Sequence, residues 1–208
     1  MKKYQLTDES MEMFGRKLYR IKAVESFGDV EEGTLGGFVE NETNLSHFGN
    51  AWIAGDAVVC EHGWVEGNAI VDDHAIIRGN AIICGNSAVS DFATVCENAC
   101  VKEYATIYEN AVVRGYSAVG GNAMIGKDAM ILESSHYLIV GPLDREAYFP
   151  TFFRAKDRTI RITQGGITYS IDEFINNLNP HLNSYHVQMY ALAIKFAKSQ
   201  IDVSEEGS

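Results

Sequence analysis

Residues 49–132 read GNAWIA GDAVVC EHGWVE GNAIVD DHAIIR GNAIIC GNSAVS DFATVC ENACVK EYATIY ENAVVR GYSAVG GNAMIG KDAMIL. They form fourteen consecutive blocks of six residues, called hexads below, without an insertion. The fifth position of every hexad is Val or Ile, and the third position is Ala, Ser or Gly. A β-branched side chain that keeps one phase through all these blocks predicts a repeat fold in which this position is always buried.

Each hexad has the pattern of a short strand followed by a corner. Side chains alternate along a strand, so the third and fifth positions share one face and point inward together. The first two positions are mostly Gly, Asn, Asp, Glu or His, which tolerate tight turns. A single repeat cannot bury its apolar side alone, so neighbouring repeats must stack into a continuous core. We therefore expect a mainly β fold, a triangular solenoid with three hexads per coil.

The repeat also sets the expected boundaries along the chain. Two earlier hexads, LGGFVE at 35–40 and NETNLS at 41–46, keep the same phase, and His47 and Phe48 then form a two-residue slip. Sixteen hexads at three per coil make about five coils. We predict an N-terminal β cap at 1–34, the solenoid at 35–132 and a C-terminal α+β cap at 133–208, because open solenoid ends need caps.

Both caps carry recognisable secondary-structure signals. The N-terminal signals predict short strands or a hairpin at 3–6 and 11–23, around Gly15. In the C-terminal segment we expect strands at 136–140, 150–154 and 159–163, a turn at 164–166, and helices at 171–178 and 184–201. Ser170 and Glu173 form a capping box for the first helix. In the second helix, Tyr185, Met189, Leu192 and Phe196 recur at helical spacing, and we expect this face to pack on the cap or the shaft.

The hexads resemble those of the hexapeptide-repeat superfamily, whose pattern residues 53–58 (IAGDAV) match directly. The resemblance implies a left-handed parallel β-helix. The terminal segments are similar to those of a group of hexapeptide-repeat proteins from bacteriophages and gut bacteria. The similar segments are YRIKA at 19–23, GDV at 28–30, LGG at 35–37, NLSH at 44–47, VGP at 140–142, TFFR at 151–154 and IDEF at 171–174. The resemblance thus implies a phage or bacterial source.

The fourth hexad position points outward and is nonetheless mostly apolar. Its apolar members are Trp52, Val58, Trp64, Ile70, Ile76, Ile82, Ala88, Cys100, Val112, Ala118, Met124 and Met130. A monomer rarely leaves so large an apolar patch in water, so we expect the C-terminal helix, another subunit or both to cover it. Hexapeptide-repeat proteins are usually trimers of parallel prisms, and the resemblance therefore implies a homotrimer.

The charge and the composition of the chain indicate which partners and which cellular compartment to expect. A formal net charge of −11 opposes nucleic-acid polymers and anionic membranes. No apolar run approaches the roughly 20 residues of a membrane span, and no apolar segment follows Lys2 and Lys3, so we expect a cytoplasmic protein in a bacterial host cell. The four cysteines lack CxxC spacing, and we expect free thiols.

Evidence for catalysis is weak in this sequence. The best-known enzymes of the superfamily that the chain resembles are coenzyme A-dependent acyltransferases, which have a catalytic His and a protruding loop. No loop interrupts the fourteen hexads here. His62 and His74 stand at corners, where polar residues are expected anyway. They lack the third repeat histidine that a zinc site would need. We assign no catalytic residue, no cofactor and no metal ligand.

The segment after the last hexad carries the candidate ligand site. Its predicted ligand-binding residues are His136, Tyr137, Arg145, Tyr148, Thr151, Arg154, Lys156 and Arg158. Guanidinium groups, hydroxyls and aromatic rings together suit a planar or phosphorylated small ligand. We expect a non-catalytic, oligomeric binding protein that sequesters a small anionic, nucleotide-like ligand such as an immune signal. A coenzyme A-dependent acyltransferase and a structural spacer stay open as alternatives.

Overall fold

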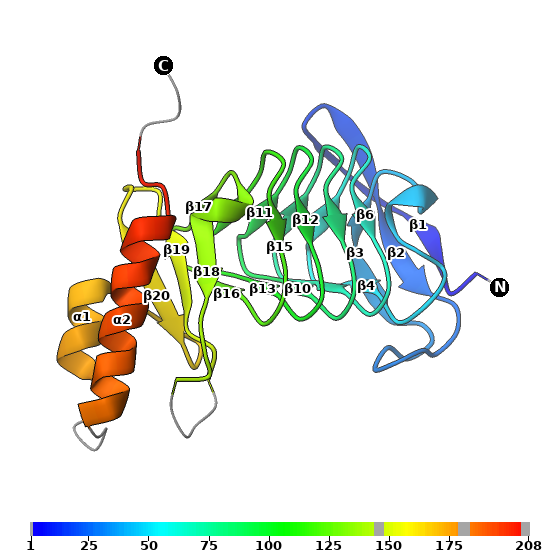
Figure 1. Cartoon of the computed structure of the whole chain (residues 1–208). Helices are drawn as coiled ribbons and strands as arrows, with labels where there is room; N and C mark the ends of the chain where they lie inside the picture. The colour runs from blue at the N-terminus through cyan, green and yellow to red at the C-terminus, as the bar shows by residue number, and fades with distance from the viewer. Residues whose placement is uncertain (1, 144–147, 179–183, 205–208) are drawn as a thin grey trace.

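The computed structural model describes residues 2–143, 148–178 and 184–204, and its centre is a shaft of stacked parallel coils (Figure 1). Its two-residue strands are β4 (Trp52–Ile53), β5 (Val58–Val59), β6 (Trp64–Val65), β7 (Ile70–Val71), β8 (Ile76–Ile77), β9 (Ile82–Ile83), β10 (Ala88–Val89), β11 (Thr94–Val95), β12 (Cys100–Val101), β13 (Thr106–Ile107), β14 (Val112–Val113), β15 (Ala118–Val119), β16 (Met124–Ile125) and β17 (Met130–Ile131). Each strand pairs in parallel with the strand three places along, so Ala88 lies between Ile70 and Thr106. The predicted β-solenoid of about five coils is confirmed.

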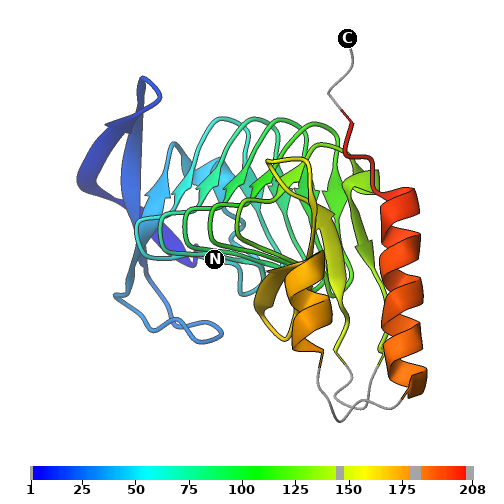
Figure 2. The same cartoon turned by 90° about the vertical axis from the view of Figure 1, so that its left-hand side faces the viewer.

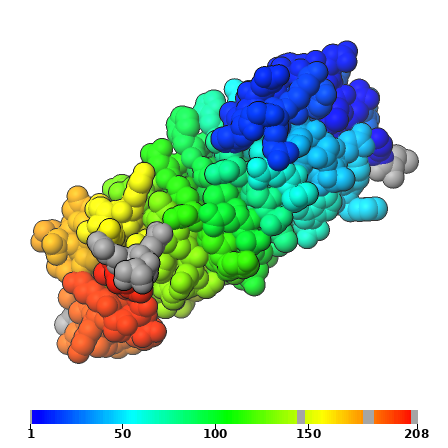
Figure 3. Space-filling view, turned by 90° about the horizontal axis from the view of Figure 1, so that it is seen from above, coloured from blue at the N-terminus to red at the C-terminus, as the bar shows by residue number. Residues whose placement is uncertain are grey.

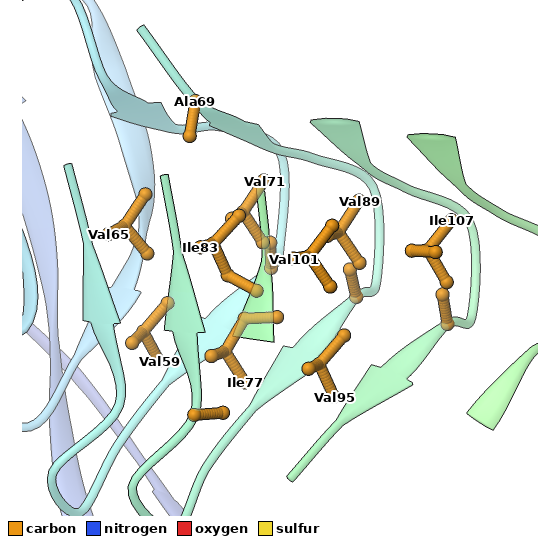
Figure 4. Close-up of a cluster of buried hydrophobic side chains, with 14 of the residues drawn as sticks. Val59, Val65, Ala69, Val71, Ile77, Ile83, Val89, Val95, Val101 and Ile107 are labelled. Atoms are coloured by element: carbon orange, nitrogen blue, oxygen red, sulfur yellow. The ribbon is translucent and has the colours of Figure 1, made fainter. Parts of the chain in front are cut away.

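The interior of the shaft is filled by the fifth hexad position. All fourteen of these Val and Ile side chains have 0% exposure, from Ile53 to Ile131. Figure 4 shows part of this set, including Val71, Val89 and Ile107, directed into the space that the strands enclose. The small third-position residues are buried beside them, because both positions lie on the same strand face.

The slip predicted at His47 and Phe48 is visible in the strand register. Before it, Val39 pairs with Val59 and Leu45 with Val65, whereas after it Ile53 pairs with Val71. The offset between neighbouring coils therefore falls from 20 residues to 18 residues. The two extra residues loop out at one corner, and the regular repeat starts at Gly49.

Every corner begins with a residue in the left-handed region. The first position of all fourteen hexads has a positive φ, and it is occupied by Gly, by Asp or Glu, or once by Lys127. Each of the six acidic residues accepts a hydrogen bond from a backbone N–H of the next coil, as Asp91 does from Glu109 at 2.9 Å. A left-handed conformation costs an L-residue about 1–2 kcal/mol, and this bond offsets part of that cost.

The N-terminal segment forms a hairpin that extends one wall of the shaft. The hairpin consists of β1 (Tyr4–Met13) and β2 (Arg16–Ala23), joined at Phe14 and Gly15, whose φ angles are both positive. Strand β2 pairs antiparallel with β3 (Leu35–Val39), which pairs in parallel with β5. Figure 3 shows the hairpin (dark blue) lying along the shaft at one end, with the helices at the other.

The outward apolar positions are covered mainly at the N-terminal end. Val58 is buried under the hairpin in a cluster with Leu18 and Phe38, and Trp52 packs edge-on against Phe27 at 5.5 Å. Of the two covers that we expected, the C-terminal helix does not provide one, because it packs on the distal cap, and cover by another subunit stays a prediction. Ile70 and Ile82 stay exposed at 47% and 40%.

The C-terminal segment closes the other end with a four-stranded antiparallel sheet. Its strands are β18 (Tyr137–Ile139), β19 (Thr151–Arg154), β20 (Ile160–Gln164) and β21 (Ile167–Ser170), in that order across the sheet. A short 3-10 helix, η2 (Ser134–His136), precedes this sheet. Another 3-10 helix, η1 (Glu42–Asn44), lies near the N-terminal end of the shaft. Phe153 points into the shaft core, whereas Phe152 and Ile162 point to the opposite face. Strand β21, which the sequence did not predict, is the second arm of the turn at Gly165.

Two helices cover the outer face of this sheet, away from the shaft (Figure 2). They are α1 (Ile171–Asn177) and α2 (Ser184–Gln200). The capping box of α1 is confirmed, because Ser170 Oγ accepts from the Glu173 N–H at 3.2 Å and the Glu173 carboxylate accepts from the Ser170 N–H at 2.7 Å.

The prediction of which face of α2 packs on the cap is wrong. Tyr185 and Phe196 of the expected face are 61% and 51% exposed. The buried stripe contains Tyr190, Ala193 and Ala197 instead. The small Ala side chains let the helix approach the sheet closely, and the Tyr190 hydroxyl accepts a hydrogen bond from the Gln164 side chain at 2.8 Å.

Candidate functional site

Three of the predicted ligand-binding residues dock the C-terminal cap onto the last coils. His136 Nδ1 accepts a hydrogen bond from the Leu132 N–H at 3.2 Å. The Tyr137 hydroxyl accepts one from the Gly120 N–H, and Thr151 Oγ1 accepts one from the Met124 N–H, both at 3.1 Å. These bonds satisfy backbone donors at the end of the solenoid, where no further coil follows.

The other predicted residues lie apart from one another. Arg154 is buried and donates to the Ser204 carbonyl at 3.4 Å, and the Tyr148 ring lies over Gly165. Lys156 and Arg158 are exposed in the turn between β19 and β20, and Arg145 lies outside the described residues. None of the seven described residues lines either of the two clefts below, and their part in ligand binding stays a prediction.

A polar cleft of about 340 Å³ lies where the shaft meets the cap. Its lining, which defines the junction cleft, is Glu109, Asn110, Lys127, Asp128 and Arg161. The first four residues come from the same corner of two consecutive coils, and Arg161 comes from β20. The Lys156 N–H donates to the Asp128 carbonyl at 2.8 Å and fixes the cap beside this corner. The Glu109 carboxylate accepts the backbone N–H of Lys127.

The junction cleft is lined by two cations and two carboxylates. Arg161 donates from Nη2 to Asp157 at 3.0 Å, but its buried Nε has no hydrogen-bond acceptor among the described residues. The pKa of the nearby Glu173 carboxyl is lowered, first by hydrogen bonds from Ser170 and further by the charges of Lys127 and Arg161. Both cations therefore lie close enough to Glu173 to affect its carboxyl group, and the Arg161 Nε has no acceptor among the described residues.

An exposed aromatic corner adjoins the junction cleft. The Phe92 N–H donates to the Glu109 carbonyl at 3.0 Å, so Phe92 stands one coil away from the cleft. Its ring is 63% exposed and stacks on the His74 ring with centroids 5.1 Å apart. Such a corner offers a flat apolar surface about 4.8 Å from the polar lining, which is the spacing of neighbouring strands.

The shaft residues of the junction cleft were missed by the sequence analysis. One signal was present, since Lys127 occupies a first hexad position where every other hexad has Gly, Asp or Glu. A basic residue there breaks the series of acidic carboxylates along the corners. What the repeat could not show is that β20 folds back beside this corner and brings Arg161 to it.

The three histidines that the sequence analysis considered do not converge. His62 and His74 stand at different corners of the shaft, and His74 is engaged with Phe92. His136 is buried in the joint between shaft and cap. Over the described ranges, no group of three or more His, Cys, Asp or Glu residues has the arrangement of a metal site.

A second cleft, of about 590 Å³, lies at the N-terminal end beside the two-residue slip. We call it the slip cleft, and its walls include Glu42, His47, Phe48, Trp64 and Glu66. The extra residues at 47–48 loop away from the regular corner of the next coil and leave this space between the two corners.

Comparison with known proteins does not assign the chain to a family. The chain matches no protein-family model and no curated protein sequence. None of the described helices combines the length and hydropathy needed to cross a bilayer. The geometry of the clefts is therefore the basis on which a function can be proposed.

Proposed function

We propose that the chain is a non-catalytic binding protein that holds a small anionic, nucleotide-like ligand in the junction cleft. The observation that carries this proposal is the position of Arg161, which lines the cleft together with Lys127 and whose buried Nε has no acceptor among the described residues. A buried donor without a partner costs about 1–3 kcal/mol, and a phosphate oxygen beside Arg161 would remove that cost.

The remaining lining suits a nucleotide better than a bare anion. Glu109 and Asp128 would repel a simple phosphate, but their carboxylates can accept hydrogen bonds from ribose hydroxyls or a base amine. Phe92, one coil away, provides a surface on which a base can stack. A cleft of about 340 Å³ is within the usual range for small ligands.

Self-association is part of this proposal. Ile70 and Ile82 leave apolar surface exposed on two different walls of the shaft, and a second subunit would cover it. We propose a homotrimer and membership of the hexapeptide-repeat superfamily, supported by the hexads and their stacking. The phage or bacterial source is proposed only from the resemblance of the terminal segments.

Isothermal titration calorimetry tests the ligand. The titrants are adenosine diphosphate, a cyclic dinucleotide and inorganic phosphate, at micromolar protein. We expect heat with at least one nucleotide, and affinity weakened roughly tenfold in Lys127→Gln, because one charge-assisted contact is lost. Phe92→Ala should weaken nucleotide binding but leave phosphate binding unchanged.

Matched variants control for charge and for exposed aromatic surface. Lys195→Gln removes an exposed lysine from α2, and Tyr116→Ala removes a ring that is 85% exposed at another corner. Both should bind like the unmodified protein. The absence of heat with every titrant, or equal weakening by Lys127→Gln and Lys195→Gln, would overturn the proposal.

A further inference from the structure

The slip cleft combines aromatic rings with a free carboxylate. Phe48 is 83% exposed, and Trp64 is half-buried on the outer side of strand β6. Neither ring stacks on another ring within the described part of the chain. The exposed Glu66 carboxylate, two residues after Trp64, forms no ion pair with any described residue.

The lysines described beside this cleft are engaged by protein groups, and the buried Lys3 ammonium donates to the carbonyls of Gly49 and Ala51 at 3.2 Å and 2.7 Å. Lys2 donates to both carboxylate oxygens of Glu42 at 2.7 Å, so these two charges neutralise each other. His47 stacks on Tyr4 with ring centroids 4.4 Å apart, and both of its ring nitrogens are buried without a hydrogen-bond partner in the part of the chain that the structure describes. Burial lowers the pKa of His47, which keeps the ring neutral at physiological pH.

These features favour one class of ligand. Aromatic faces attract cations that cannot be strongly hydrated, and a neighbouring carboxylate adds charge complementarity. A phosphate or carboxylate would instead meet the Glu66 carboxylate, while the two lysines described beside the cleft already donate to Glu42 and to backbone carbonyls. We infer that the slip cleft binds a small organic cation with a quaternary or methylated ammonium group, over Phe48 and Trp64 and beside Glu66. This inference is independent of the junction cleft, which has the opposite charge preference.

The fluorescence of Trp64 gives a direct test with choline as the probe. The chain has two tryptophans, so Trp52→Phe leaves Trp64 as the one indole. We expect a saturable fluorescence change with choline at constant ionic strength. The neutral isostere 3,3-dimethylbutan-1-ol should bind roughly tenfold more weakly, since it lacks the charge. Glu66→Gln should weaken choline binding several-fold, whereas Glu12→Gln, which removes an exposed carboxylate from the hairpin, should not.

A second measurement protects the test from a folding defect in Trp52→Phe, because Trp52 is buried. In the unmodified protein, the indole N–H resonance of Trp64 should shift with choline and saturate, and that of Trp52 should not. Equal binding of choline and its neutral isostere would show an apolar cleft without cation preference. That result, a change that does not saturate, or an unaltered response in Glu66→Gln would overturn the inference.

Discussion

The carboxylate of Glu97 accepts a hydrogen bond of 2.9 Å from the backbone N–H of Gly115, one coil further along the shaft. Both residues are first in their hexads, and both have positive φ angles, 62° and 73°. The acidic side chain thus compensates for a conformation that Gly adopts freely. This relationship explains how acidic residues occupy six of the fourteen corners without breaking the repeat.

Two substitutions of Glu97 distinguish the contribution of the hydrogen bond to stability from the cost of the left-handed backbone conformation. Glu97→Ala keeps the left-handed strain and loses the acceptor, and we expect a loss of about 1 kcal/mol in the free energy of unfolding. Glu97→Gly also loses the acceptor but relieves the strain, so its net effect should be near zero. Urea denaturation of both variants checks this. A Gly variant less stable than the Ala variant would contradict the account of the corners.

The buried interior of the shaft predicts that two adjacent residues of β13 differ in how much their substitution lowers the stability of the protein. Ile107→Ala should cost about 2–5 kcal/mol and Ile107→Val about 0.5–1.5 kcal/mol, because the side chain is fully buried. The outward, half-buried Thr106 is the matched position, and Thr106→Ala should cost about 0.5 kcal/mol or less. Thermal and chemical denaturation would measure the three values. Similar losses at both positions would contradict an inward-facing fifth position.

Much of this fold could be predicted because each coil repeats the same local physics. The position of Ile107 and its equivalents in each hexad predicts which residues form the strand, which form the corner and which side chains are buried. The slip at Phe48 also follows from counting residues between these positions. The face of α2 could not be predicted in the same way. That helix has two apolar stripes, and the choice of Tyr190 over Phe196 depends on how closely Ala193 lets it approach the sheet.

Lys3 predicts a pH dependence of stability at the N-terminal end. It is buried and donates to the Ala51 carbonyl at 2.7 Å, and burial lowers its pKa from 10.5 to about 8. Between these two pKa values the unfolded chain binds a proton that the folded chain does not, so this contribution to stability rises with pH. It should grow by about 2 kcal/mol from pH 7.5 to pH 9.5.

The Lys3→Met variant isolates this contribution. Burial raises the pKa of Cys60 to about 11, which lowers stability as the pH rises, but it does so in both proteins and cancels in the comparison. The free energy of unfolding, measured by urea at both pH values, should therefore rise more in the unmodified protein than in Lys3→Met. Parallel profiles of the two proteins would contradict the lowered pKa of Lys3.

The candidate site was less predictable than the fold, since it joins residues that are distant in sequence. The basic run from Arg154 to Arg161 was visible as a feature of composition. The structure divides it, since Arg154 donates to the Ser204 carbonyl whereas Arg161 lines the junction cleft with Lys127. Strand alternation separates side chains within such a run, and only the pairing of β19 with β20 specifies which one reaches the shaft.

The side-chain Nε–H resonance of Arg161, followed by NMR during titration with adenosine diphosphate, tests the central claim most directly. We expect this resonance to shift and saturate together with the backbone N–H of Asn110, and to need roughly tenfold more nucleotide for the same shift in Lys127→Gln. An Arg161 resonance that does not respond while other residues of the chain do would contradict the junction cleft as the binding site.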